Sequence, residues 1–209
     1  MRILVLTDYF PPRVPADASS KAPNALTALL ARGHQISVLA GRTDAPASGP
    51  EPDPKIAVRR SLCLRGALTS RPYNYFATRR VLEVAQPDLT LVWDATRLTN
   101  CAAQAVSHGS LATIAWAITS EAQARTLPRG RFLKVEHAFA LDAKVRDLAA
   151  AANPAFAQAP VFDLAASGAK LDDAVLAFHH YLVKLYTTNR FDRYKGLSAY
   201  KRNPRPFLQ

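Results

Sequence analysis

The sequence has few cysteines, no long apolar run and a shortage of acidic side chains. Only two cysteines occur in 209 residues, Cys63 and Cys101, and they form no Cys-x-x-Cys pair. We therefore expect a reduced, cytoplasmic chain with neither a disulfide framework nor a metal site. The apolar runs at residues 3–6 and 111–118 are far shorter than the roughly 18–20 residues that span a bilayer. Neither a signal-peptide core nor a membrane anchor is expected.

The shortage of acids is concentrated at the C-terminal end. Basic residues outnumber acidic ones 27 to 16, a net charge of +11, of which residues 1–178 contribute +5 and residues 179–209 contribute +6. Aromatic side chains alternate with the charges in this last segment: Tyr181, Tyr186, Phe191, Tyr194, Tyr200 and Phe207. Such a tail predicts contact with an anionic membrane surface or with single-stranded nucleic acid. Of these two partners, the membrane surface is favoured over nucleic acid. The alternative is a solvated tail that packs on the body or on a partner chain.

Strand and helix patterns alternate through the first 120 residues. Short apolar runs predict buried strands at residues 3–6, 35–40, 89–93 and 112–118, with a shorter strand at 56–58. Helical patterns cover residues 20–32, 72–85 and 96–108, and Gly33 and Gly109 suit the left-handed stop of the first and third helices. This alternation predicts an α/β fold, a doubly wound parallel sheet forming a single Rossmann-like domain over residues 1–120.

A helical pattern replaces the alternation after Ile118. Residues 142–152 and 155–169 are rich in alanine, and apolar residues recur at helical spacing over residues 171–185. Residues 121–209 are therefore predicted to form a helical C-terminal extension that ends in the basic, aromatic tail. This extension is either packed on the sheet domain or hung from it.

Three blocks of sequence resemble one enzyme family. They are MRILVLTDYFPP at residues 1–12, LTALLARGHQISVLAG at 26–41 and YFATRRVLEVAQPDLTLVW at 75–93. In this order they resemble the N-terminal, acceptor-side domain of family-4 glycosyltransferases. The resemblance implies transfer of a sugar from a nucleotide-sugar donor to a hydroxyl group of a small-molecule sugar acceptor, without a metal or other cofactor.

The chain departs from this family in three places. Residues 14–20 hold no glycine where the family has a Gly-Gly pair, and residues 118–121 read Ile-Thr-Ser-Glu where the family has His-Asp. Residues 121–209 hold no counterpart of the family's donor-binding domain. The resemblance thus implies that a second chain supplies that domain. The alternative function is that of a non-catalytic binding or assembly module that uses its basic tail. The alternative to a purely cytoplasmic location is a peripheral one at the inner face of the membrane.

Candidate site residues follow the carboxyl ends of the predicted strands, where parallel sheets bind their ligands. The catalytic candidates are the acids Asp8, Asp94 and Glu121. The substrate-binding candidates are Tyr9, Ser19, Ser20, Lys21, Trp93 and Thr119. Capping is the alternative role for the two aspartates, and core packing is the alternative for Tyr9 and Trp93. His34 is expected to be structural, and the neighbouring His179 and His180 do not have the spacing of a metal-binding pair.

Overall fold

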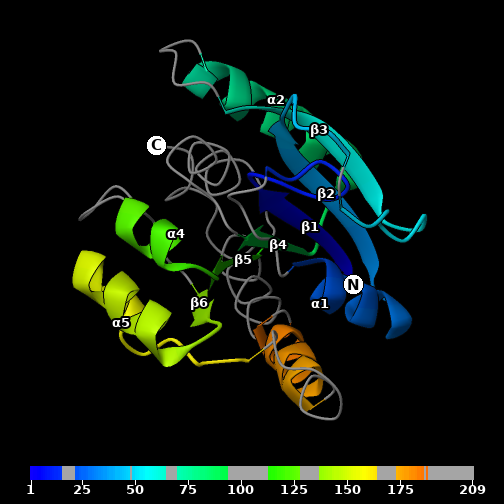
Figure 1. Ribbon diagram of the computed structural model, residues 1–209. Helices are drawn as coiled ribbons and strands as arrows, with labels where there is room; N and C mark the ends of the chain where they lie inside the picture. The colour runs from blue at the N-terminus through cyan, green and yellow to red at the C-terminus, as the bar shows by residue number, and fades with distance from the viewer. Residues whose placement is uncertain are drawn as a thin grey trace, which may run out of the picture.

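The computed structural model describes residues 1–15, 22–47, 49–64, 70–93, 113–127, 137–163, 173–185 and 187. Strands and helices alternate along this part of the chain and form a layered α/β structure (Figure 1). None of the helices in these ranges is both long and apolar enough to cross a membrane.

Six strands form one sheet in the order β3-β2-β1-β4-β5-β6, and every neighbouring pair is parallel. Their bounds are β1 Arg2–Thr7, β2 Gln35–Arg42, β3 Ala57–Cys63, β4 Leu89–Trp93, β5 Thr113–Ile118 and β6 His137–Ala140. The central strands β4 and β5 are buried throughout, as their continuous apolar runs predict. This order is that of a doubly wound Rossmann-like sheet, so the predicted fold class is confirmed.

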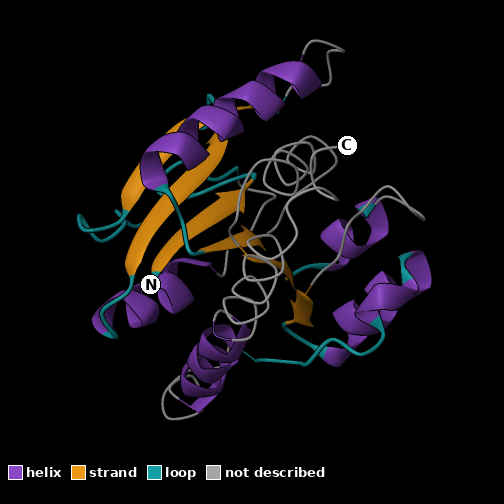
Figure 2. Cartoon of the chain, turned by 180° about the vertical axis from the view of Figure 1, so that it is seen from behind, coloured by secondary structure: helices purple, strands orange, loops and turns teal. Residues whose placement is uncertain are grey.

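Helices cover both faces of the sheet (Figure 2). The helices are α1 Ala22–Ala31, α2 Ser70–Ala85, α4 Glu121–Thr126, α5 Ala143–Ala152, the short 3₁₀ helix η1 Pro154–Phe156, and an unlabelled helix at residues 173–185. The first face packs on α1 and on the helix at 173–185, and the second packs on α2, α4 and α5. Successive residues of β1 alternate between the two cores: Ile3 and Val5 in the first, Leu4 and Leu6 in the second.

The helix at residues 173–185 belongs to the core of the sheet domain. Its apolar side chains Val175, Phe178, Leu182 and Leu185 are buried against the sheet. Tyr181 donates a hydrogen bond of 3.1 Å from its hydroxyl group to the carbonyl oxygen of Ala138 in β6. Burial raises the pKa of this phenol to about 12. The helical pattern of the sequence is confirmed here, and the helix is docked on β6 rather than hung from the domain.

The structure corrects the sequence predictions at three points. A sixth strand, β6, lies inside the segment predicted as a helical extension and was not expected, because its four residues His-Ala-Phe-Ala are too few to give a recognisable pattern. Residues 157–163, predicted as helix, contain no helical turn after η1. The strand predicted at 56–58 runs on to Cys63 as an edge strand whose exposed residues include Arg59. The helix predicted at 96–108, with Gly109 after it, lies outside the described residues.

Two glycines are required by the backbone near the sheet. Gly33 follows α1 with φ +81°, the left-handed conformation that the sequence predicted for a helix stop. Gly41 stands at an irregularity in the pairing of β2 with β3, and its N–H donates a 3.0 Å hydrogen bond to the carbonyl oxygen of Asp8. A side chain on Gly41 would overlap that carbonyl oxygen and the side chain of Leu64. Asp8 and the end of β3 therefore depend on the absence of a side chain there.

Replacing Gly41 by alanine is expected to lower the free energy of unfolding by about 2 kcal/mol, as overpacking in a buried site does. The added methyl group forces apart the Asp8 carbonyl and Leu64, one of which is backbone and cannot rotate away. Urea denaturation measures the loss. Gly49, where a Cβ would make only ordinary contacts of 3.5 Å or more, is the matched control. Equal effects at Gly41 and Gly49 would contradict the proposed crowding.

Candidate functional site

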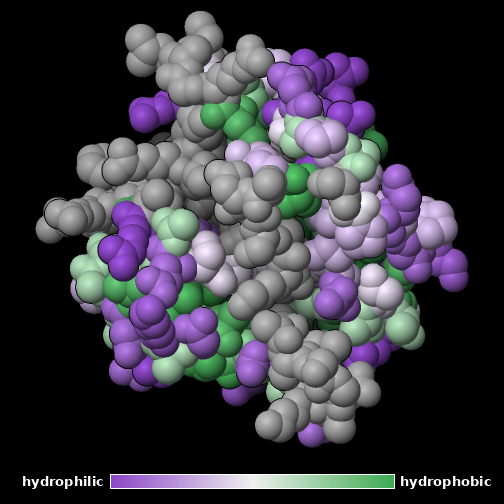
Figure 3. Space-filling model, viewed as in Figure 1, coloured by the Kyte–Doolittle hydropathy of each residue, from purple (hydrophilic) through white to green (hydrophobic). Residues whose placement is uncertain are grey.

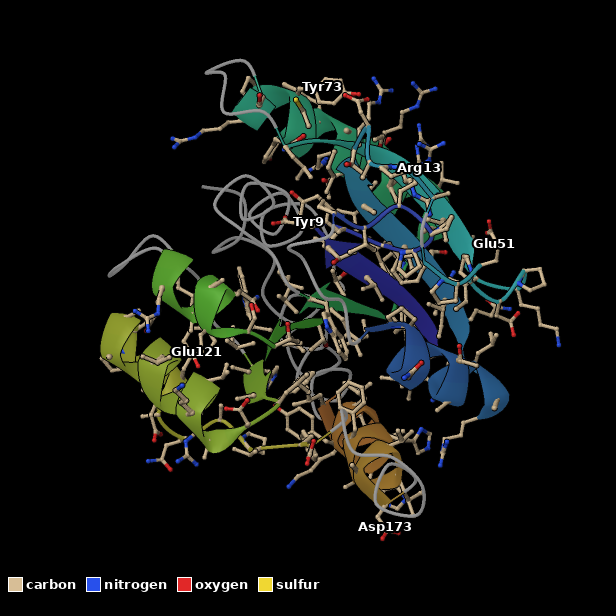
Figure 4. The ribbon with its side chains drawn as sticks, in the orientation of Figure 1. Tyr9, Arg13, Glu51, Tyr73, Glu121 and Asp173 are labelled. Carbon is tan, nitrogen blue, oxygen red and sulfur yellow. The ribbon has the colours of Figure 1, made fainter. Side chains whose placement is uncertain are left out.

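The carboxyl ends of all six strands meet at one edge of the sheet. The strand order reverses between β1 and β4: β2 and β3 follow on one side of this pair, and β5 and β6 follow on the other. In open α/β sheets the crevice beyond this reversal is the usual ligand site. Figure 4 places Tyr9 near the middle of this edge, with Tyr73 on the α2 side and Glu121 on the α4 side.

Asp8 and Tyr9 follow β1 directly at this reversal. Asp8 is buried, with 3% of its surface exposed, and its carbonyl oxygen is fixed by Gly41. Tyr9 is half-buried, and the hydroxyl group of Thr7 donates a 3.1 Å hydrogen bond to its carbonyl oxygen. The backbone that carries both candidate side chains is therefore held from two sides.

The proline-rich loop after Tyr9 is tied to the neighbouring strands. Arg60 of β3 donates from Nη2 to the carbonyl oxygens of Phe10, at 3.3 Å, and Pro11. The N–H of Gly49 donates to the carbonyl oxygen of Pro12 at 3.0 Å, and Arg13 donates to that of Ala45 at 3.2 Å. The loop thus lies against the segment that follows β2. Because residues 8–32 contain no glycine, it lacks the close backbone approach that a glycine-rich loop offers to a pyrophosphate group.

Thr119 follows β5 and is held by a side chain from α4. Its N–H donates a 2.9 Å hydrogen bond to Oε1 of Gln123, and Nε2 of Gln123 donates to the carbonyl oxygen of Ala117 at 3.2 Å. Ser120 caps α4 by accepting from the N–H of Gln123 at 3.2 Å. The carboxyl end of β5 is therefore rigid, and Thr119 is buried there with 5% of its surface exposed.

Glu121 stands at the start of α4 between two cations. Nζ of Lys144 in α5 lies 2.5 Å from one carboxylate oxygen, and Nη2 of Arg125 lies 3.4 Å from the other. The hydrogen bond from Lys144, helped by Arg125, holds the pKa of Glu121 below its usual value. Glu121 is consequently ionised and half-buried, it links α4 to α5, and it is a weak proton acceptor.

The remaining candidates separate into one core residue and several that are not described. Trp93 is fully buried, and its ring packs at 6.1 Å from Phe139 and 6.2 Å from Phe178. The structure thus places it in the core, which is the alternative to a role in stacking on a sugar. The other candidates, Asp94, Ser19, Ser20 and Lys21, lie outside the described residues.

Sequence reasoning missed the residues that shape the β2–β3 end of the edge. Asn74 of α2 is buried and clamps the backbone of Cys63: Oδ1 accepts from the Cys63 N–H at 2.7 Å, and Nδ2 donates to the Cys63 carbonyl oxygen at 2.9 Å. Beside this clamp lies a cavity of about 600 Å³. Its described lining residues are Arg42, Asp44, Ser61, Leu62, Cys63, Leu64, Ser70 and Tyr73. The one sequence signal that could have pointed to this cavity was the polar residue Asn74 within a predicted helix.

No group of three or more metal-binding side chains occurs within the part of the chain that the structure describes.

Comparisons with known proteins establish the fold and no more. No family model matches the sequence, and no curated protein is detectably similar to it. The UDP-N-acetylglucosamine 2-epimerase from Rickettsia bellii is similar in structure, with a TM-score of 0.50 and 11% identity over 88% of this chain and 49% of the epimerase. Two Bordetella bronchiseptica enzymes, WbmG in complex with NAD and WbmH in complex with NAD⁺, match with TM-scores of 0.39. Their identities are 17% and 12%, over 77% and 74% of this chain and 50% of each enzyme. The chain therefore spans about half the length of the structures it matches. It shares the Rossmann-like fold of the epimerase.

Proposed function

We propose that this chain is the acceptor-side domain of a nucleotide-sugar-dependent glycosyltransferase, with the donor-binding domain supplied by a second chain. The observation that carries the proposal is the position of the three sequence blocks that resemble family-4 glycosyltransferases. They fall in order on β1, on α1 with β2, and on α2 with β4. The epimerase that shares the fold is named for a UDP-sugar, which supports the same class of donor.

The geometry favours Asp8 over Glu121 for the chemistry. In transfer to a hydroxyl group, the bond from the sugar to the donor's diphosphate breaks as the bond to the acceptor oxygen forms, and the nucleoside diphosphate leaves. A base accepts the hydroxyl proton in this step. Glu121 is already neutralised by Lys144 and Arg125, whereas Asp8 follows β1 at the strand-order reversal. In the proposed reaction Asp8 accepts the proton, Tyr9 packs against the acceptor sugar, and Thr119 lines the opposite side. Asp94, which follows β4 in the sequence, is kept as the other candidate for this base.

The Asp8→Asn variant tests this assignment. It preserves the shape of the side chain and removes its negative charge, so we expect transfer by the chain with its donor-binding partner to fall at least about 100-fold, the usual contribution of a general base. Amide NMR shifts of the lone chain, titrated with UDP- and GDP-sugars and with simple sugars, measure binding separately. Shifts are expected at Asp8, Tyr9 and Thr119.

Asp173→Asn, at the exposed start of the helix at 173–185, is the matched control and should leave transfer and shifts unchanged. If no sugar or nucleotide-sugar moved any resonance at this edge, the domain would have no sugar site there, and the proposal would be overturned.

A non-catalytic binding module is the second candidate function. It is favoured by the burial of Asp8, Thr119 and Trp93 and by the pairing of Glu121 with two cations, because these groups are then less available to a substrate. Removing residues 188–209 distinguishes the two functions: a binding module that uses its basic tail loses its partner, membrane or protein, while an acceptor domain keeps its sugar-dependent shifts.

A further inference from the structure

We propose that the cavity between β2, β3 and α2 is a binding site for a small sugar that carries one phosphate or carboxylate group. The cavity lies at the β3 side of the carboxyl edge, and neither Asp8 nor Thr119 is among its described lining residues. Binding there does not require the proposed transfer reaction, which would only give the ligand its role as an acceptor. The volume of about 600 Å³ is within the range of about 300–1,000 Å³ that is typical of ligand sites.

The walls of this cavity are held in place before any ligand binds. Asn74 fixes the backbone of Cys63 through two hydrogen bonds. Ser70, at the start of α2, donates a 3.5 Å hydrogen bond to Sγ of Cys63. Leu64 packs where Gly41 leaves no side chain. A preformed wall reduces the ordering cost of binding, which favours a genuine site over a surface depression.

Two polar groups in the wall have no partner among the residues that the structure describes. The hydroxyl oxygen of Ser61 is inaccessible to solvent and makes no hydrogen bond within the described part of the chain. Leaving a buried polar group without a partner is unfavourable. Among the described residues, the guanidinium group of Arg42 also has no ion pair or hydrogen bond. It stands at the end of β2 and is exposed.

These groups identify the ligand class. The planar guanidinium group of Arg42 matches the paired oxygens of a phosphate or carboxylate group. Asp44 and Ser70 supply acceptors and donors suited to sugar hydroxyl groups. The ring of Tyr73 is 49% exposed and, with Leu62 and Leu64, offers an apolar surface for the C–H face of a sugar. Exposed basic residues surround this corner of α2 and β3, where the surface is strongly hydrophilic (Figure 3). Their charge favours an anion over a cation.

Protection of Cys63 from alkylation tests the site directly. The full chain is treated with iodoacetamide, and the modification of Cys63 is followed by peptide mass spectrometry with glucose 6-phosphate, glucuronate, glucose or inorganic phosphate present. We expect glucose 6-phosphate or glucuronate to slow alkylation at least about fivefold, and these two arms distinguish the phosphate from the carboxylate. Glucose and inorganic phosphate at the same concentration are expected to have little effect.

The Arg42→Gln variant removes the anion contact without disturbing the fold, because the side chain is exposed. The variant should raise the concentration of anionic sugar needed to protect Cys63 at least about tenfold, as expected for the loss of a charge-assisted pair. Arg80→Gln, on the exposed part of α2 and away from the cavity, is the matched control and should protect as the original chain does. Protection by phosphate alone to the same extent, protection by none of the ligands, or an unaltered Arg42→Gln response would each overturn the proposal. The Asp8→Asn experiment reads out different residues, so either proposal can fail without the other.

Discussion

Replacing Phe178 by alanine is expected to lower the free energy of unfolding by about 3–5 kcal/mol, the usual cost of removing a buried phenylalanine ring. The ring is fully buried between the sheet and the chain that follows β6. Its centroid lies 4.7 Å from that of Phe139, 5.8 Å from that of Phe162 and 6.2 Å from that of Trp93. The variant therefore leaves a cavity among three aromatic rings that cannot collapse into it without losing their own contacts.

Chemical denaturation followed by tryptophan fluorescence measures the loss, since Trp93 reports on the same cluster. Leu176→Ala, on the same helix and 44% exposed, is the matched control and should change the free energy by no more than about 0.5 kcal/mol. Equal effects of the two substitutions would show that the helix at 173–185 is not part of the sheet domain's core.

The sheet was largely predictable because its central strands are buried on both faces. The run Leu-Thr-Leu-Val-Trp at residues 89–93 has no other stable position than the middle of a parallel sheet, and the structure makes it β4. β6 was not predictable, because half of its four residues are alanine and only its pairing with β5 makes it a strand. The docking of the helix at 173–185 was also hidden, since a helical apolar stripe does not identify the surface that it covers.

Some features of the candidate site could likewise be predicted from the sequence, and others could not. Asp8, Tyr9 and Thr119 could be placed from sequence, because the ends of parallel strands meet at one edge whatever the details of packing. The pairing of Glu121 with Lys144 could not, because it depends on how α4 packs against α5. The cavity beside β3 could not be predicted either, because the Asn74 clamp joins a helix to a strand end that was expected to stop five residues earlier.

Acidification from pH 7 to pH 5 is expected to lower the free energy of unfolding by about 2 kcal/mol through one buried histidine. His34 is 7% exposed, and its Nε2 lies 2.9 Å from Nδ1 of His179. Its Nδ1 faces the amino group of Met1 at 3.4 Å. Since an ammonium group only donates, Nδ1 accepts, and Nε2 donates to His179. A second proton on His34 would point at the ammonium group.

Burial, with smaller contributions from the Met1 amino group, His179 and Arg32, lowers the pKa of His34 from 6.5 to about 4. Between these values the unfolded chain binds the proton and the folded chain does not, so stability falls as the pH falls. The full loss is reached below pH 4 and is roughly 3–4 kcal/mol, because a tenfold change in proton affinity is worth about 1.4 kcal/mol.

Urea midpoints measured between pH 7 and pH 5 avoid most of the carboxylate titration, which lies lower. His34→Gln should flatten the dependence in this range, because glutamine keeps a donor and an acceptor but does not titrate. His180→Gln, at the exposed neighbouring position, should leave it intact. If His34→Gln retained the whole slope, another group would have to bind the proton. If His34→Gln removed the dependence of stability on pH, the contact between the helix at 173–185 and the turn after α1 would be the part of the domain that acid destabilises.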